Sequence, residues 1–151
     1  QVALRRAMSL ALDVPKLINR LYRGQGIPAQ SMFIPHCSGY DPAFKSEMGD
    51  HDPARAKALL DLYGFVDRDG DGFRERPDGS RLTVEVATQP DQFSRQFDEA
   101  MQKDFAAVGI RLTHFYGQWS EQLKSAYAGK LQMWMLGGSA ASPDGIDTLQ
   151  A

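Results

Sequence analysis

The sequence predicts an α/β fold in which a helical lead-in is followed by strand, helix, strand, helix and strand. Segments 82–87 and 110–116 alternate apolar and polar residues as half-buried strands do, and 131–136 is the mostly apolar run of a buried strand. Two segments with helical periodicity separate these three, and the connections are short. Strands joined through helices in this way favour right-handed crossovers and a parallel sheet.

The first 24 residues predict two helices that follow each other directly. Asp13 is placed to cap the second helix, with Pro15 in its first turn. The apolar faces of the two helices comprise Leu4, Ala7, Met8, Ala11, Leu17, Ile18, Leu21 and Tyr22. From residue 24 to 51, prolines and glycines interrupt any period, so we expect a long loop.

A third helix is bounded at both ends by its sequence. Asp52 is a favourable N-cap, Pro53 suits the first helical position, and Gly64 can take the left-handed conformation that ends a helix. We expect its apolar face to comprise Ala56, Leu59, Leu60 and Tyr63.

Two further helices are expected between the strands. The first presents on one face Phe93, Phe97, Met101, Phe105 and Val108. The second presents Trp119, Leu123, Ala126 and Tyr127. Gly109 and Gly129 are placed to end them, and Trp134 lies inside the last strand, where we expect it to be part of the core.

Composition narrows the classes of partner. A formal net charge of -2, with basic residues spread along the chain, provides no positive patch for nucleic acid or an anionic membrane. No apolar run approaches the roughly 20 residues of a membrane span, so we expect no direct membrane insertion by these residues. Gln1 enters a helical pattern without a cap and the chain stops within T-L-Q-A. We therefore expect residues 1–151 to be a single partial domain of a longer protein.

The loops that follow the first and third strands are the expected ligand-binding segments. In open α/β sheets, ligands bind beyond the carboxyl ends of the strands. Segment 88–92 offers hydrogen-bonding side chains, and segment 137–144 is a polar, glycine-containing turn. The candidate ligand-binding residues are Thr88, Gln89, Gln92, Gly137, Gly138, Ser139 and Ala141.

An acidic glycine loop between the third helix and the first strand is a candidate calcium site. The run D-R-D-G-D-G matches the first half of an EF-hand loop, in which alternate carboxylates surround a hard cation. The candidate ligands are Asp67, Asp69, Asp71, the carbonyl of Phe73, Glu75 and, at the twelfth position, Asp78. A strand follows where an EF-hand has a helix, so a solvent-facing turn is the alternative.

No catalytic constellation can be assembled from the sequence. His36 and Cys37 are adjacent, and adjacent side chains rarely converge on one metal ion or form a nucleophile and base. Ser139 lies near Asp144, but the segment contains neither a G-x-S-x-G elbow nor a paired histidine. We therefore expect a protein that is not an enzyme, with a calcium-binding structural module or a hydrolase as the alternative functions.

The order of motifs resembles one known family over the whole chain. The opening L-R-R-A-M-S-L-A-L-D and R-L-Y-R-G-Q-G-I-P-A are followed by D-P-A-R-A-K-A-L-L-D-L-Y-G-F and D-R-D-G-D-G-F-R-E. Next come L-T-V-E-V, A-A-V-G-I, W-S-E-Q-L and G-G-S-A-A-S-P-D-G. This succession is similar to the third domain of the solute-binding proteins of ABC importers, in the dipeptide, oligopeptide and nickel-binding class known as solute-binding protein family 5.

The resemblance implies part of one lobe of a two-lobed, periplasmic-binding-protein-like fold. Members of such a family trap a peptide-like or other small solute by hinge closure, which is a population shift driven by contacts made only in the closed form. The closed form then docks on an ABC permease in the membrane for peptide transport or the import of related solutes. The implied location is the periplasm, or the extracytoplasmic face of the membrane through a lipid anchor.

One position departs from the family pattern. Peptide-binding members carry an aspartate in the last motif that pairs with the α-amino group of the ligand, and Ala141 occupies the matching position here. The tryptophan that usually stands just before it is replaced by Gly138. A buried ammonium group without a charge partner costs several kcal/mol. The alternatives are a solute other than a free peptide bound through its α-amino group, or a carboxylate supplied instead by Asp144 or Asp147 nearby.

Overall fold

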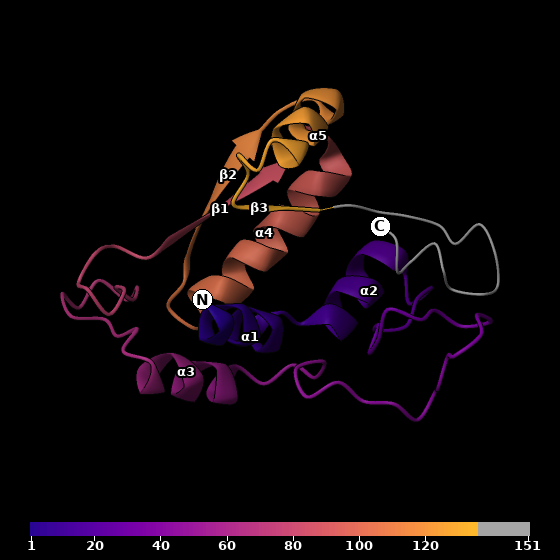
Figure 1. Cartoon of the computed structure of the whole chain (residues 1–151), viewed down its shortest axis with the longest axis horizontal. Coiled ribbons are helices and arrows are strands. Elements are labelled where there is room, and N and C mark those ends of the chain that lie inside the picture. The colour runs from indigo at the N-terminus through magenta and orange to yellow at the C-terminus, as the bar shows by residue number, and fades with distance from the viewer. Residues whose placement is uncertain (136–151) are drawn as a thin grey trace.

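The computed structural model describes residues 1–135 of the chain (Figure 1). Its helices are α1 Val2–Ala11, α2 Val14–Tyr22, α3 Pro53–Leu62, α4 Gln92–Ala106 and α5 Trp119–Tyr127. Its strands are β1 Thr83–Thr88, β2 Arg111–Tyr116 and β3 Met133–Trp134. The predicted α/β order, with a helical lead-in, is confirmed.

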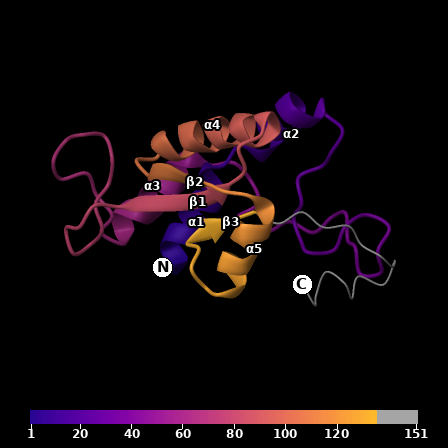
Figure 2. The same ribbon diagram turned by 90° about the horizontal axis from the view of Figure 1, so that it is seen from above.

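The three strands form one parallel sheet in the order β2-β1-β3. Thr83 pairs with Arg111 and Thr88 with Tyr116, whereas β3 pairs with β1 only through two residues. The chain moves one way from β1 to β2 and the other way from β2 to β3. Right-handed crossovers therefore place α4 and α5 on opposite faces of the sheet, as Figure 2 shows.

The core lies between α4, the sheet and the pair α1 and α3. Predicted core residues of α4 and its following turn, Met101, Phe105 and Val108, are buried there, and β1 contributes its alternate residues Val84 and Val86. The helices of the lead-in begin as predicted: the Asp13 carboxylate accepts the N–H of Lys16, and that of Asp52 accepts the N–H of Arg55. Both caps satisfy backbone N–H groups that the helix leaves without a partner.

Two glycines end helices in the predicted way. Gly64 follows α3 with φ of 79°, and Gly109 follows α4 with φ of 83°. A Cβ atom at position 109 would lie 2.9 Å from the side chain of Arg74, so this site requires glycine for space as well as for conformation. Between α2 and α3, residues 24–51 contain neither helix nor strand, as expected from their prolines and glycines.

Some residues at the ends of the predicted apolar faces are exposed rather than buried. Tyr63 is exposed because it is the C-cap of α3 and has left helical geometry. Phe93 is exposed beyond the sheet and contacts the ring of Tyr22, with ring centroids 5.5 Å apart. In α5, Tyr127 is 84% exposed, and the buried residue is Gln122 instead.

The third strand is shorter and less buried than predicted. β3 has two residues, and Trp134 is half-buried rather than part of the core. It contacts Trp119 with ring centroids 6.4 Å apart. Gln132 was predicted to be part of this strand but is not. Its side-chain oxygen, rather than its backbone, accepts the N–H of Glu85.

Candidate functional site

The carboxyl end of β1 carries the described part of the predicted ligand site. Thr88 is the last residue of β1 and is 3% exposed, Gln89 is half-buried, and Gln92 is the exposed first residue of α4. Asp91 caps α4 through the N–H and hydroxyl of Ser94. The Ser94 hydroxyl and then the backbone N–H of Ser94 lower the pKa of Asp91. The turn from strand to helix is therefore rigidly specified.

The second half of the predicted site lies outside the described residues. Gly137, Gly138, Ser139 and Ala141 all follow residue 135, so their positions are not described here. β3 runs parallel to β1 and pairs with it at Ala87, next to Thr88. Its carboxyl end consequently lies at the same edge of the sheet as Thr88.

Gln122 of α5 joins the carboxyl ends of two strands. Its Nε2 donates to the backbone carbonyl of Thr88 and, at 3.4 Å, to that of Phe115. The side chain is 4% exposed, so these bonds are made away from water. Hydrophobic periodicity could not identify this residue, since it selected Leu123 on the neighbouring face. The available signal was that carbonyls at buried strand ends need donors.

Beneath Thr88 lies a buried polar cluster, which we define as Thr88, Asp98 and His114. Asp98 is 2% exposed on the face of α4 that also carries Met101 and Phe105. The Nε2 atom of His114, whose side chain is 11% exposed, lies 3.9 Å from Oδ1 of Asp98. The Thr88 hydroxyl, both Asp98 oxygens and His114 Nε2 are buried and have no hydrogen-bond partner.

Burial raises the pKa of Asp98, and the nearby Thr88 hydroxyl and His114 ring oppose this rise only in part. The cluster escaped the sequence analysis. A carboxylate at helical spacing from Met101 and Phe105 was the signal that could have found it, because an aspartate on a core-facing stripe is unusual.

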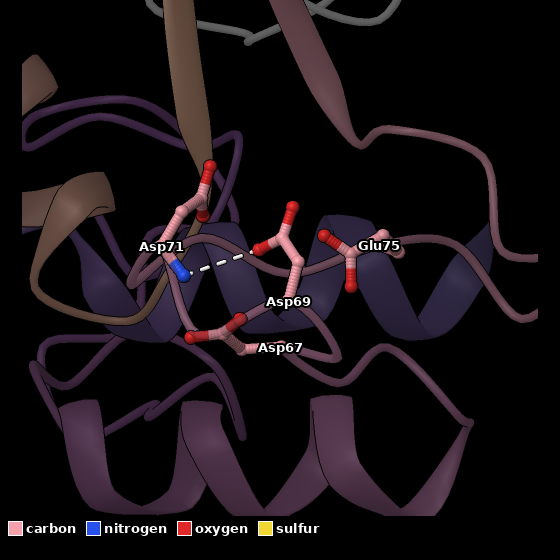
Figure 3. Close-up of side chains that lie close together, drawn as sticks. All are labelled: Asp67, Asp69, Asp71 and Glu75. Carbon is pink, nitrogen blue, oxygen red and sulfur yellow. Dashed lines mark hydrogen bonds between the residues drawn. The ribbon is translucent and has the colours of Figure 1, made fainter.

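The acidic loop brings four of its predicted ligands together (Figure 3). One carboxylate oxygen from each of Asp67, Asp69, Asp71 and Glu75 lies within 4.8 Å of the others. The two Asp67 oxygens accept the N–H groups of Gly70 and Gly72, at 2.7 and 2.9 Å. The loop therefore directs its carboxylates inward through turns closed by their own side chains.

Other charges already engage part of this loop. The N–H of Phe73 and the guanidinium of Arg111, 2.6 Å from the carboxylate, lower the pKa of Asp71. Asp78 does not join the four carboxylates. It bonds to the N–H and hydroxyl of Ser80 in the turn that leads towards β1, because an extended segment rather than a helix leaves the loop. The ring of Phe73 lies 4.4 Å below the Arg111 guanidinium carbon.

A mostly apolar groove of about 820 Å³ lies on another side of the molecule. Its walls include Leu4 and Met8 of α1, Val84 of β1, Phe105 of α4 and Met133 of β3. It does not contain the predicted ligand residues at the carboxyl end of β1. Polar side chains, among them Arg5, Ser9 and Gln132, also line the groove, so it is its position away from the carboxyl end of β1 that separates it from the predicted site.

Within residues 1–135, no helix has both the length and the hydropathy that crossing a membrane requires.

The comparisons with known proteins agree on one family. The sequence profile described as bacterial extracellular solute-binding proteins, family 5 Middle, matches residues 1–151. The chain is 30% identical to the dipeptide-binding protein of Escherichia coli over 145 residues, covering 95% of this chain and 25% of the relative. It thus spans about a quarter of the length of that relative.

Solved structures give the same result. The crystal structure of NikA from Brucella suis in complex with Fe(III)-EDTA matches with a TM-score of 0.81 and 25% identity, over 93% of this chain and 28% of that one. The periplasmic oligopeptide-binding protein of Thermotoga maritima matches with a TM-score of 0.79 and 25% identity, over 93% and 27% of the two chains.

Proposed function

This chain belongs to family 5 of the bacterial extracellular solute-binding proteins, and we propose that it forms part of one lobe of the receptor of an ABC importer. The observation that carries the proposal is the geometry at one edge of the sheet. Thr88 ends β1 there, Gln89 follows it, Gln92 begins α4, and the carboxyl end of β3 lies beside them. This is where ligands bind in open parallel sheets.

The proposed activity is capture without chemical change. A solute held at this edge would contact a second lobe only when the two lobes close, and those added contacts would favour the closed form. The receptor would work outside the cytoplasm, and in its closed form it would deliver the solute to a permease in the membrane. The relatives named above are binding proteins, which supports recognition rather than catalysis.

We further propose that the solute is a small or peptide-like molecule that needs no carboxylate at position 141. The relatives bind ligands as different as a dipeptide, an oligopeptide and a metal chelate, judged by their names. The side chain of Ala141 carries no charge to pair with an α-amino group, whereas Ser139 offers a hydroxyl to an uncharged group.

The test is native mass spectrometry of the intact protein, purified without refolding, followed by release and identification of any bound molecule. We expect one organic species in stoichiometric amount. Adding that species back should raise the melting temperature of the intact protein, because ligand binding stabilises the native state. A free peptide would contradict the inference from Ala141, and the absence of any solute that raises the melting temperature would contradict the receptor function.

Two variants then examine the edge itself. Gln89→Ala and Gln92→Ala should each weaken binding of the released solute, by about tenfold where a hydrogen bond is lost. Gln102→Ala is the matched control, since Gln102 is an exposed glutamine of α4 that lies towards the end of the helix away from Gln92. Equal affinity in all three variants would remove these two residues from the site.

A second proposal is that the acidic loop binds Ca²⁺ as a structural ion. It is supported by the four carboxylates whose oxygens lie within 4.8 Å of one another. Calcium titration calorimetry of the intact protein should show one site that Asp69→Ala abolishes. Asp50→Ala, which removes an exposed aspartate elsewhere, should leave it unchanged. An unchanged melting temperature in calcium and in chelator would contradict this proposal.

A further inference from the structure

The buried cluster of Thr88, Asp98 and His114 is not explained by packing alone. A carboxylic acid and an imidazole occupy the interface between α4 and β2, with four polar atoms that lack partners. Buried polar groups of natural proteins are hydrogen-bonded in the great majority of cases, because each unpaired group loses its hydration without compensation. An arrangement that keeps several such groups together therefore calls for a function.

The distance between the two titratable groups is informative. At 3.9 Å, Asp98 Oδ1 and His114 Nε2 are too far apart for a hydrogen bond, yet a shift of about 1 Å would bring them to bonding distance. With one proton between them, the pair is electrically neutral overall and can form such a bond. Loss of that proton to solvent leaves a buried carboxylate whose charge the nearby Thr88 hydroxyl and the His114 ring offset only in part.

The groups around this pair are mostly uncharged. On β2, the ring of Tyr116 lies 6.0 Å from that of His114, measured between the centroids. Within the described residues, β1 contributes the Thr88 hydroxyl, and α5 contributes the uncharged Gln122 to the Thr88 carbonyl. Asp91, the N-cap of α4, adds a second negative charge that disfavours ionisation of Asp98. A separate small cavity lies where α2 packs on α4. The charged residues that line it are Asp13, Lys16, Arg20, Lys103 and Asp104.

We propose that Asp98 and His114 form a buried proton-binding pair that makes the carboxyl edge of β1, and through it solute binding, sensitive to external pH. The solute arm of this inference rests on the proposed function, whereas the proton arm does not. While the pair keeps its proton, α4 stays closed on β2 and Thr88. When the proton is lost, the carboxylate draws α4 towards water, and the turn from Thr88 to Gln92 loosens.

The sign of the pH dependence follows from burial. Because the pKa of Asp98 is raised above its ordinary value of 3.8, its protonation favours the folded state. This contribution is fully present below about pH 3.8 and is lost as the pH rises through the raised pKa of the folded protein. Affinity for solute is expected to fall over the same interval.

The first experiment follows the Asp98 carboxyl group in the intact protein by ¹³C NMR after labelling of aspartate, with Asp98→Asn used to assign the signal. We expect a titration displaced to higher pH than that of exposed aspartates, together with a matching change in the signals of His114. A carboxyl group that titrates with the exposed aspartates, or independently of His114, would overturn the proposal. The wild-type measurement stands even where a variant folds poorly.

The second experiment measures the melting temperature between pH 4 and pH 9. The wild-type value should fall as pH rises through the titration of the pair, and Asp98→Asn should lose that component. Glu99→Gln and His51→Gln are matched controls, because both residues are exposed, and each should keep the wild-type profile. Superimposable profiles for the wild type and Asp98→Asn would contradict the proton arm.

Solute affinity separates the two arms. Where a solute has been identified, its dissociation constant should rise with pH in the wild type and stay level in Asp98→Asn. A titrating pair with a pH-independent dissociation constant would overturn the coupling to the binding edge while leaving the receptor function intact. A titrating pair in a protein that binds no solute would instead contradict the receptor function alone.

Discussion

The acidic loop and the buried cluster both hold aspartate carboxylates, but in surroundings that differ in exposure and in hydrogen-bond donors. In the loop, Asp67, Asp69 and Asp71 are exposed, and each accepts at least one backbone N–H. In the cluster, Asp98 is almost fully buried and neither oxygen has a partner. Carboxylates that keep water or donors remain ionised easily, whereas one that lacks both resists ionisation.

This difference distinguishes polar groups that hold parts of the fold together from polar groups that respond to a proton or a ligand. Arg74 connects the acidic loop to the core, and its side chain is only 12% exposed. The Arg74 guanidinium pairs with Asp61 and donates to the carbonyls of Phe65 and Val108. Satisfied groups of this kind hold elements together, while unsatisfied buried groups mark places where a proton or a ligand changes the energy.

The largest expected effect is the loss of stability when the contacts between the acidic loop and the core are removed. Arg74→Ala should lower the free energy of unfolding by about 3 kcal/mol, because buried carbonyls at the ends of α3 and α4 lose their donor. Urea unfolding of the intact protein measures this change. Arg76→Ala, which removes an exposed arginine from the same loop, is the control and should have little effect. Equal losses in both variants would show that Arg74 is not the anchor.

A smaller effect is expected at the other end of the sheet. Gln122→Ala should cost about 1 kcal/mol, since the Phe115 and Thr88 carbonyls lose the Gln122 amide but the Thr88 carbonyl keeps the N–H of Gly117. The same unfolding experiment measures it, with Gln118→Ala as the exposed control. A variant as stable as the control would mean that water replaces the amide, and the carboxyl edge would then be wetter than the structure indicates.

The smallest effect is expected within the loop. The pKa of Asp71 is lowered by the N–H of Phe73 and by Arg111, so its contribution to stability is present above about pH 3.8 and is lost as pH falls through the lowered value. Asp71→Asn should therefore have a melting temperature slightly below that of the wild type at neutral pH and equal to it in acid. Asp69→Asn, in the same loop, tests whether any lost carboxylate has this effect. A difference that persists in strong acid would contradict the electrostatic explanation.

Local signals in the sequence were sufficient for most of the fold. Asp13 and Asp52 cap helices as predicted because an N-cap needs only residues within one turn. The alternation of Leu82, Val84 and Val86 identified β1 for a similar reason, since the core side of a strand is fixed by a period of two.

The candidate site was less accessible to the same reasoning. Thr88 was selected correctly as a strand end, but its contacts with Asp98 and Gln122 come from residues 10 and 34 positions away along the chain. Only the packing of α4 and α5 on the sheet brings these groups together. Asp78 illustrates the opposite error, because the EF-hand spacing placed it with the other carboxylates and the local turn directs it to Ser80.

The central claim is that solute binds at the carboxyl edge of β1 and not at the acidic loop or the apolar groove. Hydrogen–deuterium exchange of the intact protein, with and without the solute that it releases, tests this directly. We expect slower exchange on binding across residues 88–92, with residues 67–78 and 4–12 unchanged. Protection confined to the loop or to α1, with residues 88–92 exchanging as in the empty protein, would contradict it.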